Sequence, residues 1–323
     1  MTMNTCIINC KPLPRHARPN STSEWGLIKN QACVITKGVT NDNALKLRFK
    51  NIKDLLDNQD IELQESLESE DKVITSNLHD YIDYCEDKKT LDLNFYSRST
   101  GITGCHHYTD EPIYLLSYNV NFDQNLKKYV ECPSYITDWF SKYMPLYKDL
   151  FVYGKKHTWF FIGPKNTKSE MHTDHDFVHT TIQQIDGQKL FFIIPPKEMR
   201  SITRHNPDYF ASLDFKLEGK TCLVSDGAND RDLEKLKTTA IYYTKLEPED
   251  VLNIPMNWGH YAKSLSPSIS VSRDYIDERN VDKYFCSILN DSRSFHFFRD
   301  GLENTELIPD LHSKVCEELE ILN

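Results

Sequence analysis

The sequence predicts a mainly β protein, a sandwich or jelly roll to which helices are added. Short runs rich in β-branched and aromatic residues end at turn residues in the middle of the chain, at 112–120, 157–164, 189–196 and 269–276. Two further runs lie within 239–255, on either side of the turn-like sequence EPED. Loops separate these strands, which favours stacked sheets over βαβ units.

The region before these strands, residues 1–110, is predicted to be a mixed α/β extension that packs on the β domain. Residues 32–39 form a short strand in this prediction, and 44–59 change from alternation to a helix-like spacing of Leu and Ile. A second helix is expected within 77–88. The acidic stretch 63–72 is interpreted as a solvated loop or helix face.

The β domain itself is predicted to span residues 111–280, and residues 281–323 a helical tail. Apolar residues in 281–292 and 310–322 recur at three- and four-residue spacing, which is typical of helices. We expect this tail either to cap the β domain or to form a homodimer interface. The polar segment 200–238 is interpreted as a long insertion, either a functional lid or a mobile loop.

Composition excludes several classes of protein. The 323 residues are 39% hydrophobic and carry a formal net charge of −10, without a basic cluster of the kind that binds duplex nucleic acid. RNA is not excluded as a substrate. The nine cysteines form no CxxC pair, the N-terminus lacks the apolar run of a signal peptide, and no stretch is apolar enough to span a bilayer. We therefore expect no membrane association and a reducing, cytoplasmic or (in a eukaryote) nuclear location.

Two segments carry candidate metal ligands, 169–196 and 251–275. In a strand, residues i and i+2 project to one side, so that His172 and Asp174 would present an imidazole and a carboxylate together. His260, which follows an Ile-Pro strand end and a Trp, is the natural remote third ligand. Two His and one carboxylate leave open positions and suit non-haem iron(II), whereas closed zinc sites use four ligands, usually with Cys.

Other polar residues crowd the first segment, so a polar loop without metal is the alternative. His175 would alternate to the face opposite His172, and we exclude it as a ligand. His179 is expected to be an ordinary polar surface residue, with a supporting or substrate-facing role as the alternative.

Lys189 follows His172 by seventeen residues and opens the apolar run LFFIIPP. A Lys at the mouth of an apolar strand needs an anionic partner, because burying an unpaired ammonium is costly. The distal carboxylate of 2-oxoglutarate would supply one. A salt bridge to one of the protein's own acids is the alternative.

Taken together, these pieces resemble the JmjC domain of the 2-oxoglutarate oxygenases. WFFIGP, HTD, GQKLFFIIPP and DVLNIP occur in the order and approximate spacing of that family. The resemblance covers residues from about 30 to 280. It implies a double-stranded β-helix, which is a cupin-like jelly roll with extra helices.

The resemblance also implies roles for individual residues. His172, Asp174 and His260 match the Fe(II) ligands, and Lys189 matches the basic residue that pairs with the C5 carboxylate of 2-oxoglutarate. Ser169 stands where the family often has a Thr that donates to the same carboxylate.

Ser272 matches a hydroxyl position that lines the co-substrate site. Thr180 and Asp274 are departures, because relatives commonly carry Asn at these places beside the co-substrate. Asp274 would add a negative charge there and needs a partner, for which Arg273 or a water is the candidate. Glu249 replaces a turn Gly that is usual in the family, a change that the turn should tolerate.

The implied activity is that of an Fe(II)- and 2-oxoglutarate-dependent dioxygenase, which consumes O₂ and releases succinate and CO₂. The favoured reaction is hydroxylation of a side chain, and the expected partner is the protein or peptide that carries it. An N-methyl-lysine demethylase and an RNA or small-molecule hydroxylase are the alternatives, and a non-catalytic cupin-like binding protein is the least favoured.

Overall fold

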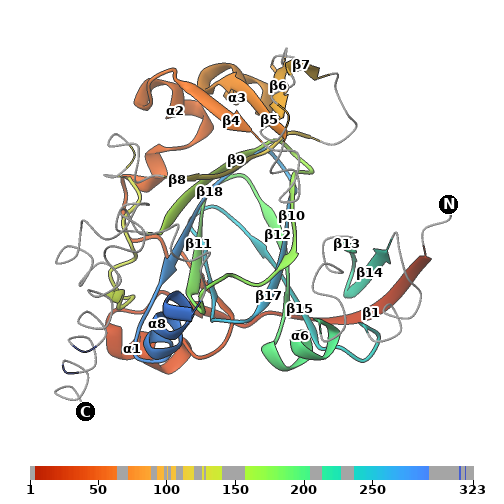
Figure 1. The fold of residues 1–323 in the computed structure, drawn as a ribbon. Coiled ribbons are helices and arrows are strands. Elements are labelled where there is room, and N and C mark those ends of the chain that lie inside the picture. The colour runs from red at the N-terminus through yellow and green to blue at the C-terminus, as the bar shows by residue number, and fades with distance from the viewer. Residues whose placement is uncertain are drawn as a thin grey trace.

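A computed structural model describes residues 4–63, 72–88, 93–97, 103–106, 112–119, 129–139, 157–203, 213–226 and 236–290, together with residues 100, 126, 313 and 317. Two seven-stranded sheets face each other and form the jelly roll that the sequence predicts (Figure 1). The predicted acidic segment 63–72 lies almost wholly outside the described residues, and so does the helix expected at 310–322.

The first sheet has the order β10-β17-β12-β15-β1-β14-β13. Its strands are β10 (Lys168–His172), β17 (Gly259–Ser264), β12 (Lys189–Ile194), β15 (Ile241–Leu246), β1 (Asn4–Pro12), β14 (Thr221–Asp226) and β13 (Leu213–Glu218). Strands far apart in sequence alternate within it, as the winding of a double-stranded β-helix requires.

The second sheet has the order β2-β3-β16-β11-β18-β9-β8. Its strands are β2 (Arg15–Ala17), β3 (Cys33–Thr36), β16 (Val251–Ile254), β11 (His179–Asp186), β18 (Ser268–Tyr275), β9 (Thr158–Gly163) and β8 (Leu115–Asn119). Every residue of β12 and β16 is buried, and so are all of β11 but its last and all of β18 but Asp274. The middle of the fold is therefore covered on both faces of these strands.

A third, four-stranded sheet has the order β4-β5-β6-β7 and comprises β4 (Asp60–Leu63), β5 (Lys72–Asn77), β6 (Leu93–Ser97) and β7 (Thr103–His106). With α2 (Phe49–Leu55) and α3 (Leu78–Cys85) it lies at the end of the jelly roll next to β8 and β9 (Figure 1). The buried Tyr81 links α3 to the jelly roll. Its hydroxyl donates to the carbonyl of Ile162 at 2.8 Å and accepts from the amide of Leu115 at 2.8 Å.

The polar segment 200–238 is not simply a loop, and this corrects the sequence-based interpretation. Within it, β13 and β14 form a hairpin whose second strand pairs with β1 from Asn4↔Asp226 to Asn9↔Thr221. The hairpin turns at Gly219, which has a φ of +64°. The apolar and polar residues of each strand alternate over a few positions only, and the polar residues around the strands make this pattern hard to recognise in the sequence. Residues 204–212 and 227–235 lie outside the described residues.

Four more helical elements complete the described fold: α1 (Thr22–Ile28), the 3₁₀ turn η1 (Ala44–Lys46), α6 (Pro196–Thr203) and α8 (Val281–Asn290). The helix expected at the start of the tail is thus confirmed as α8. It packs on the protein's own β domain, with Val281 and Tyr284 buried, and a dimer through the tail stays a prediction. No helix among the described residues is long and apolar enough to cross a membrane.

Candidate metal and co-substrate site

The two candidate His ligands are placed opposite each other by strand pairing. β10 and β17 run antiparallel, and His172 is the direct partner of His260 in their register. Side chains of directly paired residues project to the same face of a sheet. The two imidazole rings accordingly lie with their centroids 4.2 Å apart.

Asp174 joins them from the loop that follows β10, which ends at His172. Strand alternation therefore does not bring Asp174 beside His172, in contrast to the prediction, although the two side chains do meet. Asp174 Oδ1 lies 3.7 Å from His260 Nε2 and 3.9 Å from His172 Nε2. One ligand atom from each of the three residues lies within 4.8 Å of the others, as a shared metal ion requires.

Both rings are held in the orientation that metal binding needs. His172 Nδ1 lies 2.7 Å from the carbonyl oxygen of Glu170, and His260 Nδ1 lies 3.3 Å from that of Trp258. A carbonyl can only accept, so each Nδ1 carries the proton and each Nε2 presents its lone pair toward Asp174. Ligand type, spacing and orientation thus fit a divalent metal, and the set is consistent with an Fe(II) site.

The protonation states fit the same role. Burial lowers the pKa of His172 to about 4, assisted by the neighbouring His260 ring. Burial raises the pKa of the Asp174 carboxyl, but the two imidazoles and a hydrogen bond from Thr180 outweigh that effect and hold it below its ordinary value. His172 is therefore neutral and Asp174 anionic at neutral pH, which are the forms that bind metal.

Lys189 is a buried basic residue that two neutral hydroxyl groups hold in place. Its side chain is 3% exposed, and its Nζ donates to the Tyr114 hydroxyl at 2.7 Å and to Ser270 Oγ at 2.9 Å. In the part of the chain that the structure describes, no acidic group forms an ion pair with it, so the alternative of an internal salt bridge fails. Burial lowers the pKa of Lys189 to about 7. Among the described residues, this basic group therefore has no anionic partner.

Strand register places Lys189 on the same face as the metal ligands. Lys189 pairs with Ser264 and Ile193 pairs with His260, and residues two or four apart in a strand share a face. Ser169 reaches this face as well, because it pairs with Ala262 and an irregularity in β10 separates it from His172. Without that irregularity, two residues three apart would face opposite sides.

The second sheet supplies the opposite wall. In β18, Ser270, Ser272 and Asp274 alternate along one face: Ser270 contacts Lys189, and Asp274 contacts Thr180, which in turn contacts Asp174. Ser272 lies between these two ends and keeps 8% of its surface exposed. The predicted residues therefore form one strip that runs from the metal ligands to Lys189.

Two residues of this strip were missed by sequence reasoning. Ser270 could have been found, because it is two residues before Ser272 in an alternating strand. Tyr114 comes from the residue before β8, and its hydroxyl bonds both Lys189 and Ser169. Nothing in the sequence around Tyr114 marks it, since only the pairing of β8 with β9 brings it to the site.

Asp274 does not use Arg273 as its hydrogen-bond partner, in contrast to the expectation. Arg273 points to the other face of β18 and donates to Asp138 Oδ2 at 2.6 Å in a buried ion pair. Asp274 Oδ1 lies 3.0 Å from the Thr180 hydroxyl, and its Oδ2 lies 3.8 Å from His157 Nδ1. Neighbouring residues in a strand face opposite sides, which is why Arg273 cannot serve.

The two other histidines of the metal segment behave differently from each other. His175 is exposed and is not part of the cluster of three ligands, as expected. His179 is not a surface residue: it is 1% exposed, accepts a hydrogen bond from the amide of Met256 at 2.9 Å, and lies 3.4 Å from Asp277. It supports the turn before His260 from the buried interior.

Glu249 adopts the backbone conformation of a glycine, with a φ of +79° in the turn between β15 and β16. The turn tolerates it because its amide donates to the carbonyl of Gln184 at 2.8 Å and its carboxylate meets Arg48 at 3.3 Å.

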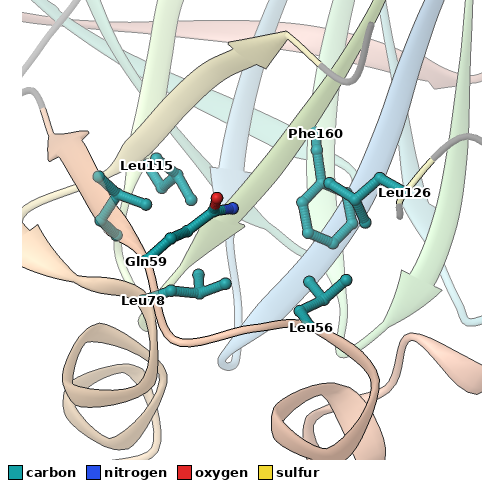
Figure 2. A pocket seen from close by; sticks show the side chains of 7 residues that line it. Leu56, Gln59, Leu78, Leu115, Leu126 and Phe160 are labelled. Carbon is teal, nitrogen blue, oxygen red and sulfur yellow. The ribbon is translucent and has the colours of Figure 1, made fainter. Parts of the chain in front are cut away.

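A separate apolar pocket lies between the jelly roll and the α2–α3 region (Figure 2). Phe160 lines it, whereas the next residue of β9, Phe161, packs beside Lys189, so the pocket lies on the other side of β9. None of its lining residues is ionisable, so the pocket offers no group for acid–base catalysis or metal binding. These residues are Leu56, Gln59, Ile61, Leu78, Leu115, Leu126 and Phe160.

Comparison with known proteins agrees with this architecture. A family described as the cupin-like domain matches residues 19–279. The chain is similar to Jumonji C domain-containing protein 5 of Drosophila melanogaster, with 28% identity over 113 residues. That match covers 35% of the chain and 26% of the relative, so the chain spans about a quarter of the curated relative that it matches.

Proposed function

This chain belongs to the cupin-like domain family, and on that premise we propose that it is an Fe(II)- and 2-oxoglutarate-dependent oxygenase that hydroxylates a side chain of a protein or peptide. The observation that carries the proposal is Lys189: a buried basic group with no carboxylate partner among the described residues, on the same face as His172, Asp174 and His260.

The spacing supports a dicarboxylate co-substrate. Lys189 lies four residues along β12 from Ile193, the partner of His260, which separates the two backbone positions by roughly 13 Å. The lysine side chain spans about half of this distance, and a five-carbon diacid suits the remainder. In the proposal, one end of 2-oxoglutarate binds at the metal, and its C5 carboxylate accepts hydrogen bonds from Lys189.

The surrounding residues orient and shield the co-substrate. Tyr114 and Ser270 hold the Lys189 ammonium in place, and Ser169 and Ser272 offer further hydroxyl donors on the two walls. The apolar residues Phe191, Ile193 and Ala262 belong to a buried cluster on this face and would exclude water. Bound iron would supply the activation of O₂, with one oxygen atom going to succinate as CO₂ leaves and the other to the substrate C–H bond.

Two of the three candidate ligands are only partly buried, which supports a macromolecular substrate. The His172 side chain is 35% exposed and that of Asp174 23%, and the neighbouring Phe177 presents an apolar ring that is 37% exposed. A side chain that projects from a polypeptide could therefore reach the metal from outside. A net charge of −10 favours neutral or basic partners over nucleic acid.

The proposed activity is tested by incubating the full chain with Fe(II), ascorbate and 2-oxoglutarate and measuring succinate, with and without a peptide library. Asp174→Ala should abolish succinate release because it removes a ligand and the only charge of the triad. His175→Ala, an exposed neighbour outside the ligand set, is the matched control and should retain activity. Equal activity of Asp174→Ala and wild type would refute the metal assignment.

Mass spectrometry of the peptides then separates the reactions of the same chemistry. A gain of one oxygen supports hydroxylation. Loss of one CH₂ from a methylated lysine would replace this proposal by demethylation. Metal binding without any turnover of 2-oxoglutarate would indicate a non-catalytic binding protein.

A further inference from the structure

The Thr180 hydroxyl bridges two carboxyl groups. Thr180 Oγ1 lies 2.6 Å from Asp174 Oδ2 and 3.0 Å from Asp274 Oδ1. Thr180 is buried and lies directly opposite Asp274 in the pairing of β11 with β18. The two distances are both those of hydrogen bonds.

A hydroxyl has one proton, so it can donate to only one of these two oxygens. The other oxygen must donate to Thr180, and a carboxyl group donates only when it is protonated. The contact with Asp174 is the shorter of the two, so Thr180 donates its proton to Asp174, the candidate metal ligand. Asp274 is therefore the neutral carboxylic acid, and the hydrogen bonds run from Asp274 to Thr180 to Asp174.

The electrostatic setting of Asp274 agrees with this proton count. Burial, and then the charge of Asp174, raise the pKa of Asp274 well above its ordinary value. His157, which lies 3.8 Å from the other oxygen of Asp274, does not supply a compensating positive charge at neutral pH, because burial lowers its pKa to about 4.

The chain of hydrogen bonds also selects which oxygen of Asp174 faces the metal. Thr180 occupies Oδ2, whereas Oδ1 is the atom that lies 3.7 Å and 3.9 Å from the two Nε2 atoms. Asp174 sits in a loop and has no strand neighbours to fix its side chain. A fixed donor at Oδ2 leaves one oxygen for the metal and prevents the carboxylate from rotating away.

We propose that Thr180 and Asp274 are positioning residues that orient the Asp174 carboxylate for metal binding, with Asp274 as a neutral hydrogen-bond donor rather than a charged contact of the co-substrate. This inference rests on the proposed metal site. It changes the roles expected for both residues, which the family resemblance places beside 2-oxoglutarate.

The test measures the affinity of the full-length apo chain for Co(II), in the absence of 2-oxoglutarate and of O₂, by titration of the visible absorption. Thr180→Val removes the donor to Asp174 and keeps the shape of the side chain. Loss of such a supporting bond typically weakens metal binding by about 10- to 100-fold. Thr180→Ser restores a hydroxyl and should restore the affinity to within a few-fold of wild type.

Thr181→Val is the matched control. It removes a buried threonine hydroxyl at the next position, where the side chain faces the opposite side and meets the carbonyl of Arg273 at 3.4 Å. It should leave Co(II) binding unchanged, which separates orientation of Asp174 from a general effect on folding. Circular dichroism and thermal unfolding of each variant confirm that the compared proteins are folded.

Asp274 is tested with a neutral donor and a non-donor. Asp274→Asn keeps a group that can donate to Thr180, so Co(II) affinity should stay near that of wild type, whereas Asp274→Leu should lower it. A large loss in Asp274→Asn would show that the carboxylate charge is needed and would overturn the proton assignment. Equal Co(II) affinity of Thr180→Val and wild type would overturn the inference while leaving the proposed function intact. Absence of Co(II) binding by wild type would instead refute the metal site itself.

Discussion

Replacing Lys189 by Met should stabilise the protein and, if the proposed function holds, remove most of its affinity for 2-oxoglutarate. The ammonium is buried and its pKa is about 7, compared with an ordinary value of 10.5. This difference means that the folded state disfavours the charged form. Met has similar length and no charge, so the substitution relieves the burial of the ammonium without opening a hole.

The expected gain in the free energy of unfolding follows from the pKa shift of Lys189 and from the hydrogen bonds that the substitution removes. At pH 7 a shift of this size corresponds to roughly 4 kcal/mol of disfavoured charge burial. Losing the hydrogen bonds to Tyr114 and Ser270 offsets about 2 kcal/mol of the stabilisation that comes from removing the buried charge. The net stabilisation is therefore on the order of 2 kcal/mol, or about 4 °C in Tm for a chain of this size.

The effect has a defined pH dependence. Because the pKa is lower in the folded protein, the unfolded chain binds more protons between about pH 7 and pH 10.5. Wild-type stability from this group therefore rises with pH across that window, and the penalty is complete below pH 7. The advantage of Lys189→Met should be largest at pH 7 and below and should disappear near pH 10.

The assay pairs thermal unfolding of the apo protein at pH 7 and pH 9.5 with the 2-oxoglutarate dependence of succinate release. Removing one partner of a buried charge pair costs about 2–5 kcal/mol, so the KM for 2-oxoglutarate should rise at least about 30-fold. Lys263→Met is the matched control, because Lys263 pairs with Leu190 and faces the other side of the sheet. An Lys189→Met protein that is less stable than wild type at pH 7, or that keeps its KM, would refute the reasoning.

Three further substitutions test other parts of the structure. Ser270→Ala should raise the KM for 2-oxoglutarate roughly fivefold at unchanged kcat, since it removes about 1 kcal/mol of support for the Lys189 ammonium; a lowered kcat with normal KM would contradict this. Asp138→Ala removes the carboxylate to which the buried Arg273 guanidinium donates and should cost about 3–5 kcal/mol, seen as a fall in Tm of about 6–10 °C; a fall of less than about 2 °C would show that the pair contributes little. Glu249→Val should destabilise by about 1–3 kcal/mol, whereas Glu249→Gly should be nearly neutral, because only Gly adopts a φ of +79° without strain; equal chemical denaturation midpoints for the two variants would argue against strain.

Strand prediction succeeded where burial and side-chain type agree. The apolar runs at 157–164, 189–196 and 269–276 became β9, β12 and β18, because β-branched and aromatic residues both favour strands and fill a core. The polar sequence of β11 gave no such signal, although Thr180, Thr181 and Gln184 are buried in it. These residues are buried because strands on both sides and the metal segment cover them, a property of the assembled sheets.

The sequence by itself determined the types of ligand and their rough grouping. An imidazole and a carboxylate two residues apart, a second imidazole after a Pro-Trp strand end, and a lysine opening an apolar run define the chemistry of the site, because residue type fixes charge and donor atoms. Together with the β-branched and aromatic strand runs, these features predicted the fold class and the candidate metal ligands.

Only the tertiary structure decided how these groups meet. It paired His172 with His260, brought Tyr114 and Ser270 to Lys189, turned Arg273 away from Asp274, and placed Thr180 between two carboxyl groups. Apart from the contact between Thr180 and Asp174, each of these contacts joins segments that are distant in the chain. Register between such strands depends on the packing of whole sheets, and a shift of one residue would turn each side chain to the other face.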